Sequence, residues 1–370
     1  MKPVRVLHLT PPGFGGIDAY IFSHYRHMDQ SRFRFEFLTQ NTGLEKAEPY
    51  RSLSYKVWPL PVTAAQDRDG FIKNIRHVFQ NQYDALHLHT SYWTGFLLEE
   101  LAKEAGIPKV IVHAHSTGVD EEDEEKQAML VKRHEEIKRV FSPDLATDYW
   151  ACSRKAAGWL FGGQISRERI RIMKNAIEAE RFRFDPLKRE KVRRELGIDS
   201  RALVLGTAGR LSYQKNHSFL IDMFAEFHRS HQNSRLIILG DGERRESLTE
   251  QVRKNGLNGA VLFLGWRQDV ENYLTAMDCF LLPSEFEGFG IVVIEAVASG
   301  LPCVVSEHVP EEVEISSKVC RIPLEIPGWL RALEEAAEGS GERLSGVELA
   351  KAAGYDVRQQ AKVLEALYEA

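Results

Sequence analysis

Acidic residues and glycines stand close together in SEFEGFGIVVIEA, residues 284–296. Gly288 and Gly290 precede an apolar segment with helical spacing, and backbone N–H groups at such a helix start can bind an anion. Glu287 lies in the loop and Glu295 more than a turn inside the predicted helix, so the two carboxylates should meet different parts of one ligand. Carboxylates accept hydrogen bonds from pairs of hydroxyl groups. A ligand with hydroxyl groups at both ends and phosphates between them is a nucleotide sugar.

Two cations follow another apolar run. The segment LVLGTAG (203–209) continues into GRLSYQKN, which places Arg210 and Lys215 five residues apart. Arginine forks to phosphate oxygens and lysine acts as a point charge, so the pair suits a diphosphate. Taken alone, such a pair is more often an ordinary feature of a protein surface.

A further glycine-rich segment, PPGFGGIDAY, follows the first apolar run and contains Gly13, Gly15 and Gly16. Such a loop lets backbone N–H groups approach a phosphate at a helix start. It departs from the dinucleotide fingerprint because Asp18 stands where the third glycine belongs, which argues against a nicotinamide dehydrogenase. A plain tight turn remains an alternative for this loop.

Short apolar runs alternate with amphipathic stretches along the chain. This alternation predicts parallel sheets covered on both faces, and two doubly wound α/β domains with five or six strands each. Ligands of such sheets bind beyond the carboxyl ends of the strands. The runs are 4–10, 33–39, 55–60, 85–90, 109–115 and 149–153, followed by 203–209, 235–242, 261–266, 279–284 and 302–307.

A charged segment separates the two predicted domains, and its role has two interpretations. Residues 160–200 are polar and predict the domain boundary, and residues 167–194 carry eleven Lys or Arg against five Asp or Glu. This segment is either a solvated connection, which we favour, or a basic patch for an anionic partner or membrane surface. The acidic run at 120–125 is expected to be a solvated loop.

Composition narrows the class of protein. A net charge of -5 over 370 residues argues against a nucleic-acid binder. The four cysteines are scattered, which indicates neither a disulfide framework nor a metal knuckle. MKPVRVLHLTPP reads as a first strand rather than a signal peptide, and no window offers the ~20 apolar residues of a membrane span. We expect a cytoplasmic protein that can touch the inner face of the membrane without crossing it.

Together these segments resemble the retaining GT-B glycosyltransferases of family 4. Glu287-x7-Glu295 resembles the family's signature, and supporting stretches match in the same order over residues 4 to 310. The early YRHMD and the later WACSRKAAGWLFG are similar to exopolysaccharide-type members. The supporting stretches are GFGG, ACS (151–153), NAIE (175–178), GRLSYQKN (209–216), GDGE (240–243) and GWRQDV (265–270).

The resemblance implies a GT-B fold with two facing Rossmann-like domains and a cleft between them. Residues 1–165 would form the acceptor-side domain and residues 170–354 the nucleotide-sugar-binding domain, with a C-terminal helix at about 355–370 packing back on the first. The implied reaction transfers a sugar from a nucleotide donor, most often UDP-linked, to a saccharide or lipid-linked acceptor with retention of configuration. Exopolysaccharide or cell-surface glycan synthesis would be its setting, with no cofactor and no metal.

Site residues follow from the resemblance position by position. Arg210 and Lys215 would neutralise the diphosphate, Glu287 would hold hydroxyls of the transferred sugar, and either His113 or His115 would lie near the reacting carbon. Glu295 would hold the ribose, and Arg267 would border the base. Departures from the family pattern are Glu178, where Asp is commoner, and Ile17-Asp18 after the glycine loop. The implied donor-binding residues are Gly15, Gly16, Gly209, Arg267, Gly288, Phe289, Gly290, Ile291 and Glu295.

Other interpretations of single motifs remain. His87-x-His89 and His113-x-His115 could each place two imidazoles on one strand face, but a zinc site needs further ligands. Asp67-Arg68-Asp69 resembles the metal-binding Asp-x-Asp of another transferase fold, yet it lies in a polar loop. The aromatic stretch SYWTGF (91–96) could stack on an acceptor sugar or fill the core.

Two rival functions also remain. A nucleotide-sugar epimerase of GT-B fold would convert the donor without any acceptor, and product analysis with and without acceptors separates it from a transferase. A non-catalytic sugar-nucleotide-binding subunit would often have lost Glu287, Lys215 or Arg210, and all three are present.

Overall fold

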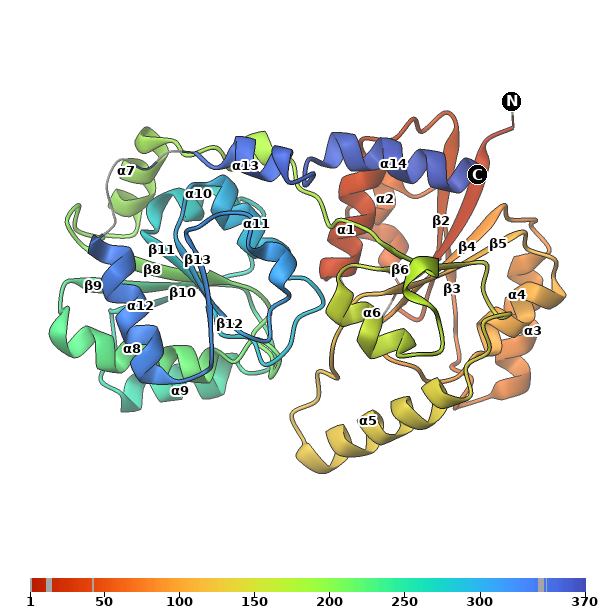
Figure 1. Cartoon of the computed structure of the whole chain (residues 1–370), viewed down its shortest axis with the longest axis horizontal. Helices are drawn as coiled ribbons and strands as arrows, with labels where there is room; N and C mark the ends of the chain where they lie inside the picture. Colours follow the sequence, from red (N-terminus) through yellow and green to blue (C-terminus); the bar gives the residue numbers. More distant parts are fainter. Residues whose placement is uncertain (1, 11–14, 42, 339–342, 344) are drawn as a thin grey trace. The chain divides into compact units, whose positions relative to one another are not determined.

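The computed structural model describes residues 2–10, 15–41, 43–338, 343 and 345–370. It forms two compact units (Figure 1). Unit 1 comprises Met1–Val119, Ala128–Ala176 and Val357–Ala370, and unit 2 comprises Asp120–Gln127 and Ile177–Asp356. The chain thus changes unit after residues 119, 127, 176 and 356. The sequence suggested one change between residues 165 and 170 and a second after residue 354.

Unit 1 is built around a seven-stranded parallel sheet in the order β3-β2-β1-β4-β5-β6-β7. Its elements alternate as the apolar runs predict, because each run forms a strand and each amphipathic stretch a helix. The strands are β1 (Val4–Leu9), β2 (Phe33–Thr39), β3 (Lys56–Pro59), β4 (Ala85–Thr90), β5 (Lys109–Ala114), β6 (Asp148–Ala151) and β7 (Ile170–Ile172). The α-helices are α1 (Gly16–Tyr25), α2 (Tyr50–Leu53), α3 (Arg68–Phe79), α4 (Leu97–Glu104), α5 (Glu124–Arg139), α6 (Arg154–Phe161) and α14 (Val357–Glu369).

Unit 2 holds a six-stranded parallel sheet in the order β10-β9-β8-β11-β12-β13. Its strands are β8 (Leu203–Ala208), β9 (Ser234–Leu239), β10 (Val261–Gly265), β11 (Cys279–Leu282), β12 (Cys303–Ser306) and β13 (Val319–Ile322). Its α-helices are α7 (Pro186–Glu195), α8 (His217–Ser230), α9 (Arg245–Lys254), α10 (Val270–Ala276), α11 (Ile291–Ala298), α12 (Ile326–Glu338) and α13 (Val347–Ala352).

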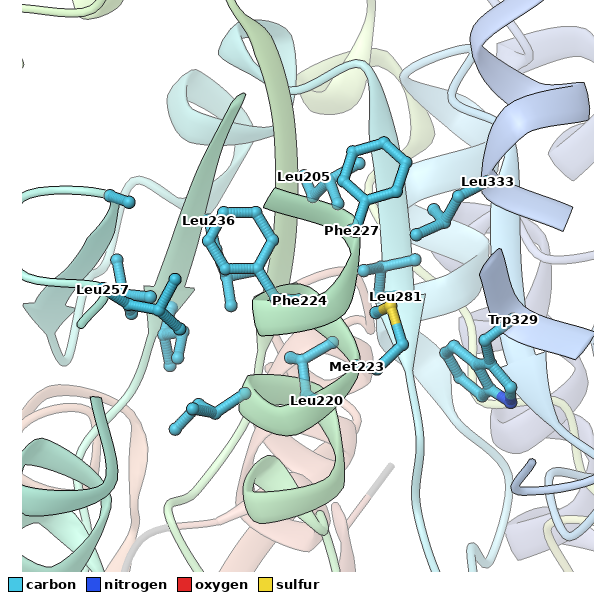
Figure 2. Packing of buried hydrophobic residues seen from close by; sticks show 14 of the residues in the cluster. Leu205, Leu220, Met223, Phe224, Phe227, Leu236, Leu257, Leu281, Trp329 and Leu333 are labelled. Carbon is cyan, nitrogen blue, oxygen red and sulfur yellow. The ribbon is translucent and has the colours of Figure 1, made fainter. Parts of the chain in front are cut away.

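The core of unit 2 gathers around α8. Phe224 and Phe227 of this helix pack with Leu205, Leu236 and Leu281 of three adjacent strands (Figure 2). These side chains are almost fully buried, and truncating a buried phenylalanine to alanine costs about 3–5 kcal/mol in other proteins. Leu220 and Ile221, in the first half of α8, are fully buried in the same cluster and anchor the start of the helix next to the loop from β8.

Each sheet has one point where the strand order reverses. The chain builds β1, β2 and β3 outward on one side and then returns to place β4 on the other side of β1. In unit 2 the same step places β11 beside β8, after β9 and β10. At such a switch point, the loops that follow the two adjacent strands run to opposite faces of the sheet. A crevice forms between these loops, and ligands of doubly wound folds bind in it.

The structure places four features that the sequence analysis discussed: Asp67, the aromatic stretch at 91–96, the C-terminal helix and the question of a membrane span. Asp67 caps α3, since its carboxylate accepts a hydrogen bond from the backbone N–H of Gly70 at 2.9 Å. Trp93 is buried and stacks on Phe141, which places the aromatic stretch at 91–96 partly in the core. Helix α14 packs on unit 1, where Tyr368 is buried. Among the described residues, no helix is both long and apolar enough to span a bilayer.

Candidate functional site

Two loops meet at the switch point of unit 2. One leads from β8 to α8 and contains Lys215, and the other leads from β11 to α11 and contains Glu287. Hydrogen bonds join them: the backbone N–H of Glu285 donates to the carbonyl of Gln214 at 2.9 Å, and the Asn216 amide donates to the Glu285 carboxylate at 2.7 Å. The Gln214 amide also donates to the carbonyl of Phe286 at 3.0 Å. The two loops therefore form one structural unit.

An ion pair lies at the centre of these loops. Lys215 Nζ donates to Glu287 Oε1, and the hydroxyl of Ser284 donates to the same oxygen at 2.7 Å. The side chains of Lys215 and Glu287 are only 16% and 6% exposed. Removing one partner of a buried ion pair leaves the other charge uncompensated, which costs several kcal/mol. Each residue therefore keeps the other in place, and Ser284, which the sequence analysis did not single out, fixes the orientation of the carboxylate.

Glycines make room for the lysine. A Cβ atom at Gly209 would lie 3.2 Å from Lys215 Cε, so the lysine stem runs closely along this residue. A Cβ atom at Gly240 would lie 1.9 Å from the carbonyl oxygen of Gly209, a distance that no side chain can accommodate. The GDGE stretch is thus explained by close packing of backbone against the loop that carries Lys215.

The start of α11 offers backbone N–H groups beside this ion pair. Gly290 has φ 91°, a left-handed conformation that favours glycine, and Ile291 begins the helix. Phe289 is buried, with its ring centroid 5.3 Å from that of Tyr355. The side chain of Phe289 therefore belongs to the core, and this residue can offer a ligand only its backbone.

Glu295 lies inside α11 and is half-buried, so it is more exposed than Glu287. Burial raises the pKa of this carboxyl to about 7, and the nearby Arg181 acts in the opposite sense. Arg181 also donates to the carboxylate of Glu271 at 2.8 Å. Arg181 was missed in the sequence because it lies in the charge-dense segment at 160–200, where no pattern separates it from its many basic neighbours.

The two arginines proposed from the sequence are more exposed than Lys215. Arg210 is 68% exposed and pairs with Glu243, with Nη2 to Oε2 at 3.0 Å. Arg267 donates to the carbonyl of Leu264 at 3.0 Å and lies over the ring of Tyr273. The structure therefore brings Lys215 and Glu287 into contact, whereas Arg210 and Arg267 make contacts of their own.

The acidic run at 120–125 is exposed, but it is not only a solvated loop. Asp120 Oδ1 accepts a hydrogen bond from the backbone N–H of Gln214 at 3.0 Å. Glu122 lies 3.2 Å from Arg244 Nε. These contacts explain why Asp120–Gln127 groups with unit 2 although the surrounding chain belongs to unit 1.

Unit 1 carries a cluster of histidines at its own switch point. His8 on β1 is the register partner of His87 on β4, and His89 on β4 is the partner of His113 on β5. Four of the rings are at most 5% exposed, and His115 just beyond β5 is half-buried. The ring nitrogens form hydrogen bonds with one another: His8 with His89 at 3.0 Å, His89 with His115 at 2.8 Å, and His87 with His113 at 3.1 Å.

Burial keeps these histidines neutral. It lowers the pKa of His8 and His115 to about 3 and that of His87, His89 and His113 well below the usual value. Neutral imidazoles are able to bind a metal ion. Ring nitrogens of His8, His87 and His89, and likewise of His89, His113 and His115, lie within 4.8 Å of one another. Each of these triads contains one hydrogen-bonded pair, His8 with His89 in the first and His89 with His115 in the second.

The glycine loop of unit 1 is described from Gly15 onward, and Gly13 lies outside the described residues. Gly15 caps α1 and Gly16 is its first residue. The Asp18 carboxylate accepts from the backbone N–H of Gly15 at 3.0 Å and from the hydroxyl of Tyr50. Asp18 therefore stabilises the start of α1, which explains why an acid replaces the third glycine of a dinucleotide site.

Family models match both halves of the chain. The model described as "Glycosyltransferase Family 4" matches residues 14–181, and "Glycosyl transferases group 1" matches residues 188–322. A curated relative, "Putative glycosyltransferase EpsF" from Bacillus subtilis, is 30% identical over 98% of this chain and 96% of its own. The chain belongs to the GT-B glycosyltransferases.

A further curated relative and a solved structure are similar to this chain over most of its length. "UDP-Gal:alpha-D-GlcNAc-diphosphoundecaprenol alpha-1,3-galactosyltransferase" from Escherichia coli is 25% identical over 90% of this glycosyltransferase and 85% of its own chain. The crystal structure of HepE from Anabaena in complex with UDP-glucose has a TM-score of 0.77 at 20% identity and covers 99% of this chain and 100% of its own. The predicted fold of two Rossmann-like domains is confirmed.

Proposed function

We propose that this glycosyltransferase moves a sugar from a UDP-sugar to a saccharide or lipid-linked acceptor, with retention of configuration, in exopolysaccharide or cell-surface glycan synthesis. The observation that carries the proposal is the buried Lys215–Glu287 pair at the switch point of unit 2. It combines a cation for a diphosphate with a carboxylate for sugar hydroxyls. The Escherichia coli relative is named for a UDP-galactose donor and a diphosphoundecaprenol-linked acceptor, which supports this donor and acceptor class.

Phosphate recognition is assigned to Lys215 and Arg210. An ammonium has three N–H donors, and Lys215 gives one to Glu287, so others can reach phosphate oxygens. Arg210 would have to leave Glu243, but an exposed pair of this kind contributes only about 0–1 kcal/mol. Arg210 can therefore exchange Glu243 for a phosphate at little cost in free energy. The backbone N–H groups at the start of α11 supply a further positive potential.

Sugar recognition is assigned to the two glutamates. Glu287 would accept hydrogen bonds from hydroxyls of the transferred sugar through Oε2, which accepts only a long hydrogen bond of 3.5 Å from the Gln214 amide among the contacts described for that oxygen. Glu295, farther along α11, would hold the ribose. Arg267, after β10, would border the base. Gly15 and Gly16 at the start of α1 remain part of the proposed donor contacts.

The proposed mechanism is displacement on one face of the sugar. The bond between the anomeric carbon and the diphosphate oxygen breaks while the acceptor oxygen bonds to the same face of that carbon. The acceptor proton passes to the departing diphosphate oxygen, so no protein base is required. The protein orients the reactants and stabilises the charge that develops on the diphosphate.

The proposal is tested with a panel of nucleotide sugars and saccharide or lipid-linked acceptors. We expect a UDP-sugar to raise the melting temperature and to yield a glycosylated product with the donor's anomeric configuration, read by proton NMR. An inverted product contradicts retention. An isomerised nucleotide sugar formed without any acceptor indicates an epimerase, and binding without any product indicates a non-catalytic subunit.

Replacing Glu295 with alanine should weaken UDP binding. Loss of a hydrogen bond to a charged group costs about 1.5–3 kcal/mol, so we expect roughly 10- to 100-fold weaker affinity by calorimetry. Glu271→Ala is the matched control, because Glu271 also lies beside Arg181 but is not assigned to the ribose. Equal losses in both variants, or unchanged affinity in a folded Glu295→Ala, would show that Glu295 serves only the helix.

Transfer should not need a divalent metal. Lys215, Arg210 and the start of α11 can offset the two to three negative charges of the departing diphosphate, and Asp67, the first acid of the Asp-x-Asp, is occupied as a helix cap. We expect turnover after exhaustive EDTA treatment and dialysis to stay within about twofold of the untreated enzyme. Loss of activity that magnesium or manganese restores would contradict this expectation.

A further inference from the structure

Three histidines of unit 1 form a continuous hydrogen-bonded chain. His8 Nδ1 lies 3.0 Å from His89 Nε2, and His89 Nδ1 lies 2.8 Å from His115 Nε2. The inner end of the chain, His8, is buried between β2 and β4, and the outer end, His115, is half-buried just beyond the carboxyl end of β5. The chain therefore runs from the core toward the edge of the sheet where ligands of such folds bind.

Hydrogen bonds between neutral imidazoles must all point the same way along such a chain. Each neutral ring has one N–H and one lone pair, so the middle ring, His89, donates to one neighbour and accepts from the other. Two arrangements remain. Either each ring donates outward, which leaves a lone pair on His8 Nε2, or each donates inward, which leaves a proton there.

The surroundings of His8 decide between the two arrangements. His8 Nε2 is buried and has no hydrogen-bond partner. The His8 ring packs against Phe35 and Phe37, with ring centroids 4.3 Å and 5.4 Å away. A buried N–H without an acceptor is rarer and more costly than an acceptor without a donor. The outward arrangement is therefore favoured, and His8 and His89 both carry their proton on Nδ1.

We propose that His89 is a positioning residue: its Nδ1–H donates to His115 Nε2 and so holds His115 in the Nδ1–H tautomer. Since Nε2 of His115 is occupied as an acceptor, the ring has only an N–H to offer a ligand. Its partner must then be an oxygen acceptor, such as a sugar hydroxyl or a phosphate oxygen. This ligand assignment rests on the proposed function, whereas the tautomer itself does not.

The second chain in the cluster does not fix a tautomer. Tyr368 OH lies 2.7 Å from His87 Nδ1, and His87 Nε2 lies 3.1 Å from His113 Nδ1. If each group donates toward His113, the buried Nε2 of His113 carries an N–H that has no partner. If each group donates toward Tyr368, the Tyr368 hydroxyl accepts from His87, and its own proton has no partner within this hydrogen-bonded chain. His113 is also completely buried. Of the two candidates, His113 within β5 and His115 just beyond it, His115 is therefore the one assigned to the ligand.

Nitrogen NMR of the metal-free, ¹⁵N-labelled enzyme tests the tautomer without any substrate. We expect the long-range ¹H–¹⁵N correlations of His115 to show a protonated Nδ1 and an unprotonated Nε2, unchanged from pH 5 to pH 8. A protonated Nε2, or a His115 that titrates in this range, would overturn the inference. One tightly bound zinc per chain in elemental analysis would also overturn it, because ligation would replace the hydrogen bonds.

Two variants of the same chain separate positioning from packing. His89→Phe removes the donor to His115, so we expect a mixture of His115 tautomers and roughly 3- to 10-fold weaker binding of a UDP-sugar. His8→Phe deletes an equally buried ring but leaves His89 free to donate, so the His115 tautomer and the affinity should stay within about twofold. Equal effects of both variants on tautomer and affinity would contradict the proposal. An enzyme without transferase activity whose His115 nonetheless carries Nδ1–H would refute the proposed function alone.

Discussion

Glu287→Gln is expected to lower turnover about 10- to 100-fold, because a hydrogen bond to a charged group contributes about 1.5–3 kcal/mol. UDP affinity should stay within about threefold of the wild type, since Glu287 is assigned to the sugar rather than to the nucleotide. The glutamine keeps an oxygen that can accept from Lys215 and Ser284, so the hydrogen bonds between the two loops should persist. The lost carboxylate charge leaves Lys215 uncompensated, so the melting temperature should fall. Initial rates with a UDP-sugar and calorimetry with UDP measure the two quantities.

Glu285→Gln is the matched control for this variant. Glu285 lies two residues away in the same loop, but its carboxylate accepts from Asn216. We expect its turnover to fall less than about threefold. Near-normal transfer by Glu287→Gln, or an equal loss in both variants, would remove Glu287 from the reacting centre.

Lys215→Ala should abolish most transfer, with a loss of about 100-fold or more. The variant removes a cation assigned to the diphosphate and also leaves the buried Glu287 without its partner, an effect that costs about 3–5 kcal/mol in other proteins. Added magnesium should not restore the rate, because nothing in the proposal places an ion at this position. Transfer rates with and without magnesium and thermal unfolding measure both effects.

Stability and catalysis are separated by two further variants. Lys215→Met/Glu287→Leu removes both charges at once and should unfold at a higher temperature than Lys215→Ala while remaining inactive. Arg210→Ala removes an exposed cation and should leave stability unchanged, with a smaller loss of turnover than Lys215→Ala. Substantial activity in the double variant would show that Lys215 and Glu287 matter only for the fold.

The central strands could be predicted from the sequence, whereas the edges could not. Runs such as LVLGTAG and CFLLPS are buried on both faces and are therefore continuously apolar. The edge strands β7 (IRI) and β13 (VCRI) are short, partly exposed and interrupted by arginine. They carry no such signal. Unit 1 consequently has seven strands where five or six were expected, and its second segment continues past β7 to Ala176.

Single motifs of the candidate site were visible in the sequence, but their contacts were not. Lys215 and Glu287 are 72 residues apart, and only the placement of β11 beside β8 brings their loops together. Alternation along a strand did predict that His87 and His89 share one face. It could not predict that His8 would join them, because a single histidine in an apolar run does not reveal which strand will lie beside it.

Release of nucleoside diphosphate from a panel of nucleotide sugars tests the central claim most directly. Purified wild type, Glu287→Gln and Lys215→Ala would each be incubated with every donor, with and without acceptors, and products would be quantified by chromatography. We predict that the wild type releases UDP from at least one UDP-sugar, faster with acceptor, and that both variants lose most of this release. Nucleotide sugars that bind but release no nucleoside diphosphate under any condition, or release that both variants retain, would contradict the assignment of Lys215 and Glu287 to sugar transfer.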